Sequence, residues 1–512
     1  MAEQTPRTVR ELLRAVARAI FLAVLLLPPV ILLVPSLAFP SSERWCRAFE
    51  SALLRALERG GPCLIKLGQW ASTRPDVLPL SLCRALGSLH DRVPPHSLEH
   101  SVAAIEEAFG VPCEDIFASL SDKPIGSGCV AQVHIATTAP SVEGSVDAAA
   151  ASAAVAPHGT RVAIKVLHPG VEQSVALDLY LLRTCARVFE AALSPVVHGL
   201  HWLAMREALD EFSAFMALQL DLREEGRNLL AFGARFAGDE HVRFPEPLRR
   251  PRHVLIAGRR VGSDDDDDET DDLLASRRVL VESFLEGETL ASMLRARTGA
   301  TRRTAGDAAL ARVGLKAFLK MVLQDNFVHA DLHPGNILVL PGVASVPSNG
   351  GGGGDGGGDV GQGGEGDVRL GFVDAGLVVE LSAADRANFL ALFAAIARGD
   401  GERAGELMLS RATEERCADP HAFKQGMKTL IGRVRAGERG AFNLSNVRIG
   451  DVLLDVTSLV RTHSVKADPS FTTLVMAIVV LEGLGRELDP TLDLFSVALA
   501  NFPAAFVEAA AH

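Results

Sequence analysis

Residues 328–338, VHADLHPGNIL, carry the clearest chemical signal in the chain. They place Asp331 and Asn336 five residues apart in a predicted loop between a long helix and a short strand. Such a loop can offer one carboxylate to a substrate and one amide oxygen to Mg²⁺ during phosphoryl transfer. His, Asp, Pro, Gly and Asn are also common in turns, but the complete HxDxxxxN spacing favours chemistry.

A second carboxylate follows in residues 370–376, LGFVDAG. A strand that ends in Asp-x-Gly can hold its carboxylate against the metal that bridges nucleotide phosphates. A simple turn is the alternative, but the position after the HxDxxxxN loop favours a metal role. We therefore predict Asp331 as the catalytic carboxylate and Asn336 and Asp374 as magnesium ligands.

A glycine loop precedes these motifs in residues 125–134, IGSGCVAQVH, directly before a predicted strand. Phosphate oxygens need a close backbone approach, which glycines permit through absent side chains and unusual dihedral angles. Alone the motif is weak, because glycine pairs before strands often form ordinary turns. The nucleotide-binding candidates are Gly126, Ser127, Gly128, Cys129, Val130 and Ala131.

One lysine interrupts the apolar strand VAIK, at Lys165. A lysine on a buried strand needs an anion, which nucleotide phosphates can supply; an exposed strand end is the alternative. Its expected carboxylate partner is Glu225 in the helix DLREEGRNLLAF, with Glu224 as the alternative in a shifted register. We count Lys165 and Glu225 as catalytic, and Lys165 and Glu282 as nucleotide-binding candidates.

Three biased segments interrupt the chain: 139–160 is rich in Ala and Ser, 262–276 is acidic, and 341–367 is mostly Gly. None can bury enough apolar surface to offset the entropy of ordering, so we predict mobile loops. Each lies between two predicted strands, where insertions cost least. The strand sequences are VAQVHIA, RVAIKVL, HVLIAG, RVLVESFL, NILVL and VRLGFVD.

Apolar residues at three-to-four spacing predict that helices make up most of the remaining chain. TTLVMAIVVL, inside the last of these helices, is too short to span a membrane and is predicted to be a buried core helix. Strands followed by helices indicate an α+β fold. The predicted helices cover 174–193, 202–236, 308–324, 383–398 and 471–484.

Composition excludes several classes of protein. Of the formal charge of −12 over 512 residues, eight negative charges lie in residues 264–272, so the rest of the chain is only weakly acidic. No basic footprint for nucleic acid is present, and we expect no nucleic-acid partner. The seven cysteines form no CxxC pair, which argues against structural zinc or a disulfide framework and indicates reduced thiols.

The N-terminal region is apolar, with no charged residue from 19 to 42. Residues 19–39 have nearly the length of a single transmembrane segment, although three prolines interrupt them. Upstream arginines at helical spacing resemble an organelle-targeting helix, weakened by two glutamates. A membrane anchor is the preferred interpretation; a removed presequence and a buried helix are the alternatives.

The order Lys165, Glu225, Asp331, Asn336, Asp374 resembles the protein-kinase-like superfamily. The sequence KLGQ, residues 66–69, resembles the KxGQ motif of the UbiB/ADCK (aarF domain-containing) atypical kinases. The likeness covers residues 63–490 with the three biased segments excluded. Further stretches that resemble this family are WASTRPDVLP, VAIKVLHPGVEQSV, HADLHPGN and VLEGLGRELDP.

The resemblance implies an atypical two-lobed kinase-like fold of the α+β class. The N-lobe would be preceded by a KxGQ helical extension, and the C-lobe would be helical. The predicted boundaries are 1–45 for targeting or membrane attachment, 46–120 for the extension, 121–290 for the N-lobe and 291–512 for the C-lobe.

The family resemblance further implies a KxGQ helix that packs over the active site. The regulatory candidates are Lys66, Gly68, Gln69 and Asp221, with a surface lysine as the alternative for Lys66. The family's Glu-x-Asp appears here as Gln-Leu-Asp, which leaves Asp221 as the charged partner expected for Lys66. The loop GSGC also replaces the family's alanine-rich loop. Both details resemble the second human-type aarF-domain kinase.

The expected function is an ATP- and Mg²⁺-dependent kinase or ATPase that supports coenzyme Q or related prenyl-lipid metabolism in a mitochondrial or plastid membrane. Expected partners are membrane lipids, prenyl-quinone intermediates or a biosynthetic complex. One alternative is a nucleotide-dependent lipid-binding scaffold or chaperone without phosphoryl transfer. The third is a protein serine/threonine kinase, which the missing Ala-Pro-Glu after Asp374 disfavours.

Overall fold

A computed structural model describes residues 8–75, 77–89, 93–139, 159–193, 205–249, 273–296, 305–341, 368–410, 417, 419–435, 449–463, 465 and 469–503. The chain divides into two compact units. Unit 1 comprises Met1–Arg227 and Pro247–Phe284, and unit 2 comprises Asn228–Glu246 and Leu285–His512. The predicted strand HVLIAG and nearly all of the three biased segments lie outside the described residues.

Unit 1 contains an antiparallel five-stranded sheet in the order β1-β3-β4-β6, with β2 paired to β3. The predicted strands VAQVHIA, RVAIKVL and RVLVESFL are confirmed as β3, β4 and β6. Their valines and isoleucines suit a pleated surface with a buried face. The strands are β1 Phe117–Leu120, β2 Gly126–Ser127, β3 Ala131–Thr138, β4 Arg161–Leu167 and β6 Val279–Ser283.

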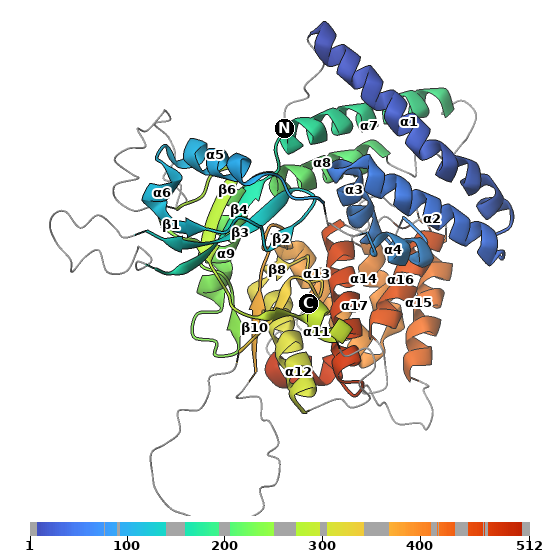
Figure 1. Ribbon diagram of the computed structural model, residues 1–512. Helices are drawn as coiled ribbons and strands as arrows, with labels where there is room; N and C mark the ends of the chain where they lie inside the picture. The colour runs from blue at the N-terminus through green and yellow to red at the C-terminus, as the bar shows by residue number, and fades with distance from the viewer. Residues whose placement is uncertain are drawn as a thin grey trace, which may run out of the picture. The chain divides into compact units, whose positions relative to one another are not determined.

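Two helices, α5 (Leu98–Phe109) and α6 (Cys113–Ile116), lie beside this sheet (Figure 1). Ile105 of α5 and Ile164 of β4 are fully buried and belong to one apolar cluster with Val281. The left-handed Gly110, with φ of +72°, ends α5, a conformation that favours glycine. This cluster makes the sheet a rigid support for the residues of β4.

The remaining helices of unit 1 include the N-terminal extension. A second apolar cluster joins Leu22, Leu57, Leu64, Leu86 and Leu89. The helices are α1 Val9–Ala38, α2 Glu43–Gly60, α3 Pro62–Ser72, α4 Leu80–Leu86, α7 Val171–Leu193, α8 Met205–Gln219 and the first turns of α9 Leu222–Arg235.

The prediction of one helix over 202–236 is wrong, because α8 and α9 are separate helices. The break lies at Leu220 and Asp221. The Asp221 carboxylate accepts a hydrogen bond from the backbone N–H of Arg223 at 3.2 Å. This is the N-cap interaction that starts a new helix. Apolar periodicity continues through the break, so spacing alone could not reveal it.

Unit 2 contains a four-stranded sheet in the order β5-β10-β9-β7, in which β5 and β10 are parallel, and a separate β8–β11 pair. The predicted strands NILVL and VRLGFVD pair antiparallel as β9 and β10. The bounds are β5 Val242–Arg243, β7 Glu288–Thr289, β8 Val328–His329, β9 Ile337–Leu340, β10 Arg369–Phe372 and β11 Val378–Val379.

Helices make up the rest of the described part of unit 2. The predicted helix 308–324 is α12, Ala305–Leu319, followed by a π-helical turn, Lys320–Asp325. The predicted buried core helix is confirmed in α17, where Leu474, Val475 and Ile478 are buried. The others are α11 Leu290–Ala296, α13 Ala383–Arg398, α14 Gly401–Ser410, α15 Pro420–Arg435, α16 Ile449–Thr462, α17 Pro469–Leu488 and α18 Leu494–Asn501.

Candidate active site

Lys165 and Glu225 form a buried ion pair in unit 1. The Lys165 Nζ donates to both carboxylate oxygens of Glu225, at 2.7 and 2.9 Å. The Glu225 side chain is 4% exposed and the Lys165 side chain 16%. Glu224 is instead half-exposed and pairs with Arg227. The structure therefore places Glu225, and not Glu224, against the strand lysine.

The strand register explains why Lys165 occupies this position. On β4, Lys165 lies between Val133 of β3 and Leu280 of β6. Both neighbours are apolar, so the ammonium group is poorly solvated and favours a carboxylate partner. Glu282, two residues after Leu280 on β6, is also buried and opposes Ala163.

The glycine loop forms a tight hairpin between β2 and β3. Gly126 opposes Val133, and the Gly128 N–H donates to the carbonyl of Ala131 at 2.9 Å. Cys129, Val130 and Ala131 are buried. These three candidates therefore anchor the loop in the interior of unit 1.

Gly126 and Gly128 do not have the positive φ angles that the sequence suggested, so that expectation is wrong. A Cβ atom at Gly126 would meet no atom within 4 Å, and one at Gly128 would meet only the Ala131 carbonyl at 3.5 Å. The protein itself does not require glycine at either position. Open space above a glycine is what close approach of a phosphate requires.

Ser127 lies between these glycines, and its hydroxyl oxygen is buried with no hydrogen-bond partner among the residues that the structure describes. Buried hydroxyls are rarely left unsatisfied in folded proteins. A phosphate or ribose oxygen that reached this hydroxyl would satisfy it. The loop fits a nucleotide at this point.

The KxGQ segment lies on α3 of unit 1. Lys66 is only 6% exposed, so the alternative of a surface lysine is wrong. Gly68 fits closely in this packing, since a Cβ there would lie 2.3 Å from Leu89 Cδ1 and 2.9 Å from Leu57 Cδ1, and these buried methyl groups would have to move. The Gln69 side-chain amide donates to the Leu89 carbonyl at 3.4 Å. The motif therefore packs α3 against α2 and against the segment that follows α4.

Asp221 is bound to Arg223 and not to Lys66 as expected from the family pattern. The guanidinium of Arg223 donates to both carboxylate oxygens of Asp221, at 2.9 and 2.7 Å. Burial raises the pKa of Asp221, but the hydrogen bonds and charge of Arg223 outweigh it and the pKa is lowered. The carboxylate at this position serves as a helix cap.

Asp331 and Asn336 are joined within the loop of unit 2 between β8 and β9. The Asn336 side-chain amide donates to the backbone carbonyl of Asp331 at 3.0 Å. The backbone carbonyl of Asn336 accepts a hydrogen bond from the Val373 N–H at 3.0 Å, which ties the loop to the end of β10. Because the bond to Asp331 engages the amide nitrogen, the amide oxygen is the side-chain atom of Asn336 that could serve as a metal ligand.

His329 fixes the loop from beneath. It is fully buried, its Nε2 lies 3.1 Å from the Val373 carbonyl, and its Nδ1 accepts from the Asp331 N–H at 3.2 Å. A carbonyl only accepts, so the proton is on Nε2. Burial lowers the pKa of His329 against the opposing charges of Asp331 and Asp374. A neutral imidazole thus positions the loop between β8 and β9.

Asp374 has a φ of +62°, in the left-handed backbone region that residues other than glycine rarely adopt. Asn228 holds the following peptide by donating to the Ala375 carbonyl at 2.8 Å. Strained residues of this kind persist where the surroundings hold them, often at functional sites. The half-buried Asp374 carboxylate and the Asn336 amide supply hard oxygen donors, which suit Mg²⁺ completed by phosphates and water.

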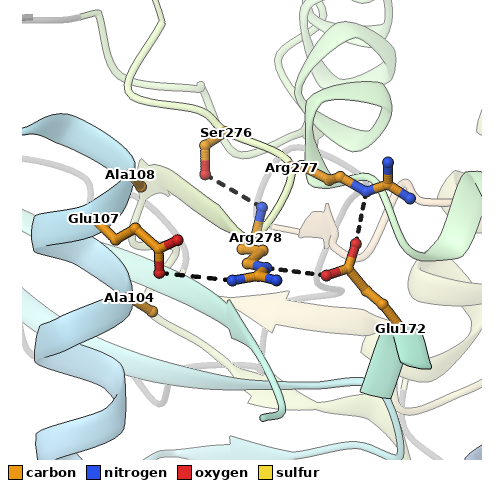
Figure 2. A pocket seen from close by; sticks show the side chains of 7 residues that line it. All are labelled: Ala104, Glu107, Ala108, Glu172, Ser276, Arg277 and Arg278. Atoms are coloured by element: carbon orange, nitrogen blue, oxygen red, sulfur yellow. Dashed lines mark hydrogen bonds and ion pairs between the residues drawn. The ribbon is translucent and has the colours of Figure 1, made fainter. Parts of the chain in front are cut away.

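A surface pocket of about 320 Å³ lies elsewhere on unit 1 (Figure 2). Arg278 is ion-paired with Glu107 at 3.6 Å and Glu172 at 3.0 Å, and Arg277 with Glu172 at 2.7 Å. Ser276 and two alanines complete the lining. The predicted site residues are not among those that line it, and its arginines already have carboxylate partners, so the pocket is not assigned to the active site.

Sequence reasoning missed two buried or half-buried histidines that contact the backbone of the candidate loops. His329 positions the loop that carries Asp331, and His168 Nε2 lies 2.8 Å from the Gly128 carbonyl. Both lie inside motifs that the sequence analysis quoted. Their roles depend on contacts between distant segments, which spacing does not reveal.

Comparison with known proteins finds two matching family models. Residues 88–256 and 270–408 match the ABC1 atypical kinase-like domain, and residues 441–493 match the UbiB helical domain. The chain belongs to the ABC1/UbiB atypical kinase family. Its mixed α+β fold is therefore kinase-like.

Three relatives illustrate the range of this family. The mitochondrial ABC1 family protein YPL109C of Saccharomyces cerevisiae is 33% identical over 89% of this chain and 67% of its own length. The probable serine/threonine-protein kinase abkC of Dictyostelium discoideum is 31% identical over 94% and 68%. The mitochondrial ABC1 family protein C21C3.03 of Schizosaccharomyces pombe is 32% identical over 87% and 64%. The chain thus spans about two thirds of each relative.

Proposed function

We propose that this protein is an ATP- and Mg²⁺-dependent atypical kinase or ATPase that supports coenzyme Q or related prenyl-lipid metabolism. The observation that carries the nucleotide site is the ion pair of Lys165 with Glu225, because Lys165 lies in the same sheet as the glycine loop. Within the described part of the chain, the Ser127 hydroxyl of that loop has no hydrogen-bond partner. In protein kinases a strand lysine held by a helix glutamate binds nucleotide phosphates. The prenyl-lipid role rests on the family resemblance.

In this proposal Asp331 accepts or orients the proton of the attacking hydroxyl or water. Asn336 and Asp374 would hold Mg²⁺, which neutralises charge on the transferred phosphoryl group. Two contacts support these roles. His329 holds the backbone of Asp331, and Asn228 holds the peptide that follows Asp374. Lys66, Gly68 and Gln69 would restrict access to the site in the manner of the family.

We also propose a mitochondrial membrane location through the apolar segment 19–39, with membrane lipids and prenyl-quinone intermediates or a biosynthetic complex as partners. Support comes from α1, whose mean hydropathy reaches 2.6 over 18 residues, and from the two fungal relatives with mitochondrial names. The details of the glycine loop and Gln219 would place the protein nearest the second human-type aarF-domain kinase.

The test measures ATP binding and hydrolysis by the full chain, with and without Mg²⁺ and lipid vesicles. Asp374→Asn should remove magnesium-dependent binding, whereas Asp331→Asn should keep binding and lose turnover. Asp455→Asn, at an exposed position on α16, is the matched control and should behave as the wild type. Unchanged binding in Asp374→Asn would refute the metal assignment.

The same assay separates the alternative functions. A protein that binds ATP but neither hydrolyses nor transfers it, even with lipid present, would be a nucleotide-dependent scaffold or chaperone. Transfer to serine or threonine in a peptide would instead identify a protein kinase. Either result would replace the proposal.

A further inference from the structure

Helix α1 has two opposite faces along its whole length. Ala15, Leu22, Pro29 and Ser36, spaced seven residues apart, are buried. Leu13, Ile20, Leu27 and Val34, with the same spacing, are between 54% and 69% exposed. Each exposed residue precedes a buried one by two positions, which corresponds to a rotation of about 200° around the helix axis. The stripe of Leu13, Ile20, Leu27 and Val34 therefore points away from unit 1.

The buried stripe faces α2 and the helices beside it. Figure 1 shows α1 and α2 side by side within unit 1, and Leu22 belongs to the cluster of Leu57 and Leu64. Arg18 of α1 also donates to both carboxylate oxygens of Asp178 on α7 at 2.7 Å and to the Gly60 carbonyl at 2.5 Å. Asp178 is fully buried, so this ion pair holds the N-terminal third of α1 to the unit.

The composition of α2 opposes a spanning arrangement. Its exposed face carries six charged residues, and charges inside hydrocarbon are costly. If α1 crossed a bilayer while packed along α2, several of these charges would enter the apolar layer. Four of the six are arginines, which suits contact with anionic headgroups. They are Glu43, Arg44, Arg47, Arg55, Glu58 and Arg59.

We propose that α1 lies parallel to a membrane surface, with the stripe of Leu13, Ile20, Leu27 and Val34 among the acyl chains and α2 toward the headgroups. Interfacial helices bind in this manner through an apolar face and nearby basic groups. The inference deepens the proposed membrane attachment and rests on it. A spanning segment over 19–39 would then not form while Arg18 holds Asp178.

Depth measurements on the full chain in vesicles distinguish the two arrangements. A fluorescent amino acid is placed singly at positions 13, 20, 27 and 34 and, as a control, at the exposed Glu58. Vesicles contain phosphatidylcholine with or without phosphatidylglycerol, and carry lipids brominated at a shallow or a deep acyl position. Equal quenching at the four α1 positions, strongest with the shallow lipid, is expected.

Quenching that deepens toward 20 and 27 and weakens at 13 and 34 would indicate a spanning helix and overturn the inference. Quenching at Glu58 as strong as at Leu27 would also overturn it. A chain that does not bind either vesicle would refute the proposed membrane attachment itself. Tighter binding with phosphatidylglycerol is expected from the arginines of α2.

A second, independent observation concerns a chain of polar side chains beneath the glycine loop. The His168 Nε2 lies 2.8 Å from the Gly128 carbonyl oxygen, and its Nδ1 lies 2.8 Å from the Nδ1 of His96. The His96 Nε2 lies 2.9 Å from the Ser101 hydroxyl. Three connected contacts therefore start at the loop.

The chain continues into the core of unit 1. The Ser101 hydroxyl lies 3.1 Å and the Gln132 amide nitrogen 2.9 Å from the Nε2 of His134. The His134 Nδ1 then lies 2.9 Å from the Ser121 carbonyl oxygen. Ser101, Gln132 and His134 are at most 1% exposed. Both ends of the chain are backbone carbonyls.

These carbonyl ends determine where each proton lies. Carbonyl oxygens only accept, so His168 carries its proton on Nε2 and His134 carries its proton on Nδ1. In neutral His168 the Nδ1 is then an acceptor, and His96 must donate from Nδ1. Burial lowers the pKa of His96 to about 4 and also lowers the pKa of His168, which keeps both rings neutral.

We infer that His168 is a positioning residue for the nucleotide loop, with His96 fixing its tautomer. In a trans peptide the carbonyl and the next N–H point in opposite directions. Holding the Gly128 carbonyl toward His168 therefore fixes the direction of the Cys129 N–H and prevents the carbonyl from turning toward phosphate. The inference rests on the proposed nucleotide role of the loop.

A pair of substitutions tests this role. The amide of Gln can place a donor near the position of Nε2, whereas Asn places it near Nδ1. His168→Gln should stay within about twofold of the wild type in KM for ATP, and His168→Asn should raise KM about tenfold with a smaller effect on kcat. His421→Asn, exposed on α15, is the control.

Nitrogen-15 NMR of the unliganded protein at neutral pH supplies an independent readout. His168 should show the Nε2–H tautomer, and His96 and His134 the Nδ1–H tautomer. An Nδ1–H tautomer at His168, or equal KM values for His168→Asn and His168→Gln, would overturn the inference. Wild-type protein that binds no ATP would instead refute the proposed function, whatever the tautomers.

Discussion

Replacing Glu225 by Gln removes the charge from the most buried ion pair of the candidate nucleotide site. Gln has nearly the same volume, so the packing of α9 should persist. Lys165 would lose the carboxylate that now lies 2.7 Å from its Nζ. The consequences for stability and for catalysis can both be estimated from this geometry.

At 2.7 Å and an effective dielectric constant near 20, the attraction of the pair is about 6 kcal/mol before desolvation is counted. Removing one partner of a buried pair typically costs 3–5 kcal/mol. Because the Lys165 side chain keeps 16% exposure, we expect the lower end, about 3 kcal/mol in the unfolding free energy of unit 1. A similar loss in the transition state would reduce kcat/KM for ATP about 100-fold.

Hydrogen exchange of the β4 amides measures the opening of unit 1 without requiring two-state unfolding of the whole chain. Initial rates of ATP hydrolysis measure kcat/KM. Glu224→Gln is the matched control, because Glu224 is half-exposed and pairs with Arg227. It should cost less than about 0.5 kcal/mol. Combining Glu225→Gln with Lys165→Met should reveal a coupling of about 2 kcal/mol.

Two results would refute this reasoning. If the Glu225→Gln protein showed the same amide exchange rates and the same rate of ATP hydrolysis as the wild type, the ion pair would be unimportant to both fold and function. A larger loss in Glu224→Gln would show that α9 presents the other carboxylate to Lys165. In that case the helix register, and with it the nucleotide site, would need revision.

Gly68→Ala should lower the thermal midpoint, at a cost of about 1–3 kcal/mol, because its Cβ would lie 2.3 Å from a leucine methyl group. Gly432→Ala, in open space on α15, should be neutral or stabilising; equal effects would contradict the packing argument. Arg18→Leu should cost about 3 kcal/mol by leaving the Asp178 carboxylate buried without its guanidinium, and adding Asp178→Asn should recover part of the loss in urea unfolding. The pKa of His96 falls from 6.5 to about 4 on folding, so its contribution to stability is complete above pH 6.5 and is lost as pH falls toward 4. His96→Asn should flatten the pH dependence of stability over that range, and an unchanged slope would argue against it.

Local sequence patterns predicted the elements that carry several candidate site residues. The strand pattern around Lys165 and the HxDxxxxN spacing depend on neighbours in the chain, and the structure has β4 and the β8–β9 loop at those positions. The choice between Glu224 and Glu225 was harder, because adjacent helical residues differ by about 100° in direction. Only packing of α9 against the sheet resolves that choice.

Other expectations failed for identifiable reasons. The break between α8 and α9 depends on the cap made by Asp221, which apolar periodicity does not register. Asp221 therefore binds Arg223 and not Lys66. The glycines of the loop were expected to have unusual dihedral angles, but neither Gly126 nor Gly128 has a positive φ, and a Cβ at either position would meet open space or one ordinary contact.

The sequence by itself determined the order of chemical groups, the kinase-like family pattern and the apolar character of α1, because each depends on residue types at short spacing. The tertiary structure decided which groups meet. The Lys165–Glu225 pair, the Arg18–Asp178 pair and the contact of His168 with the Gly128 carbonyl join residues 40 to 160 positions apart. Contacts over such separations arise when the core packs, and no local pattern specifies them.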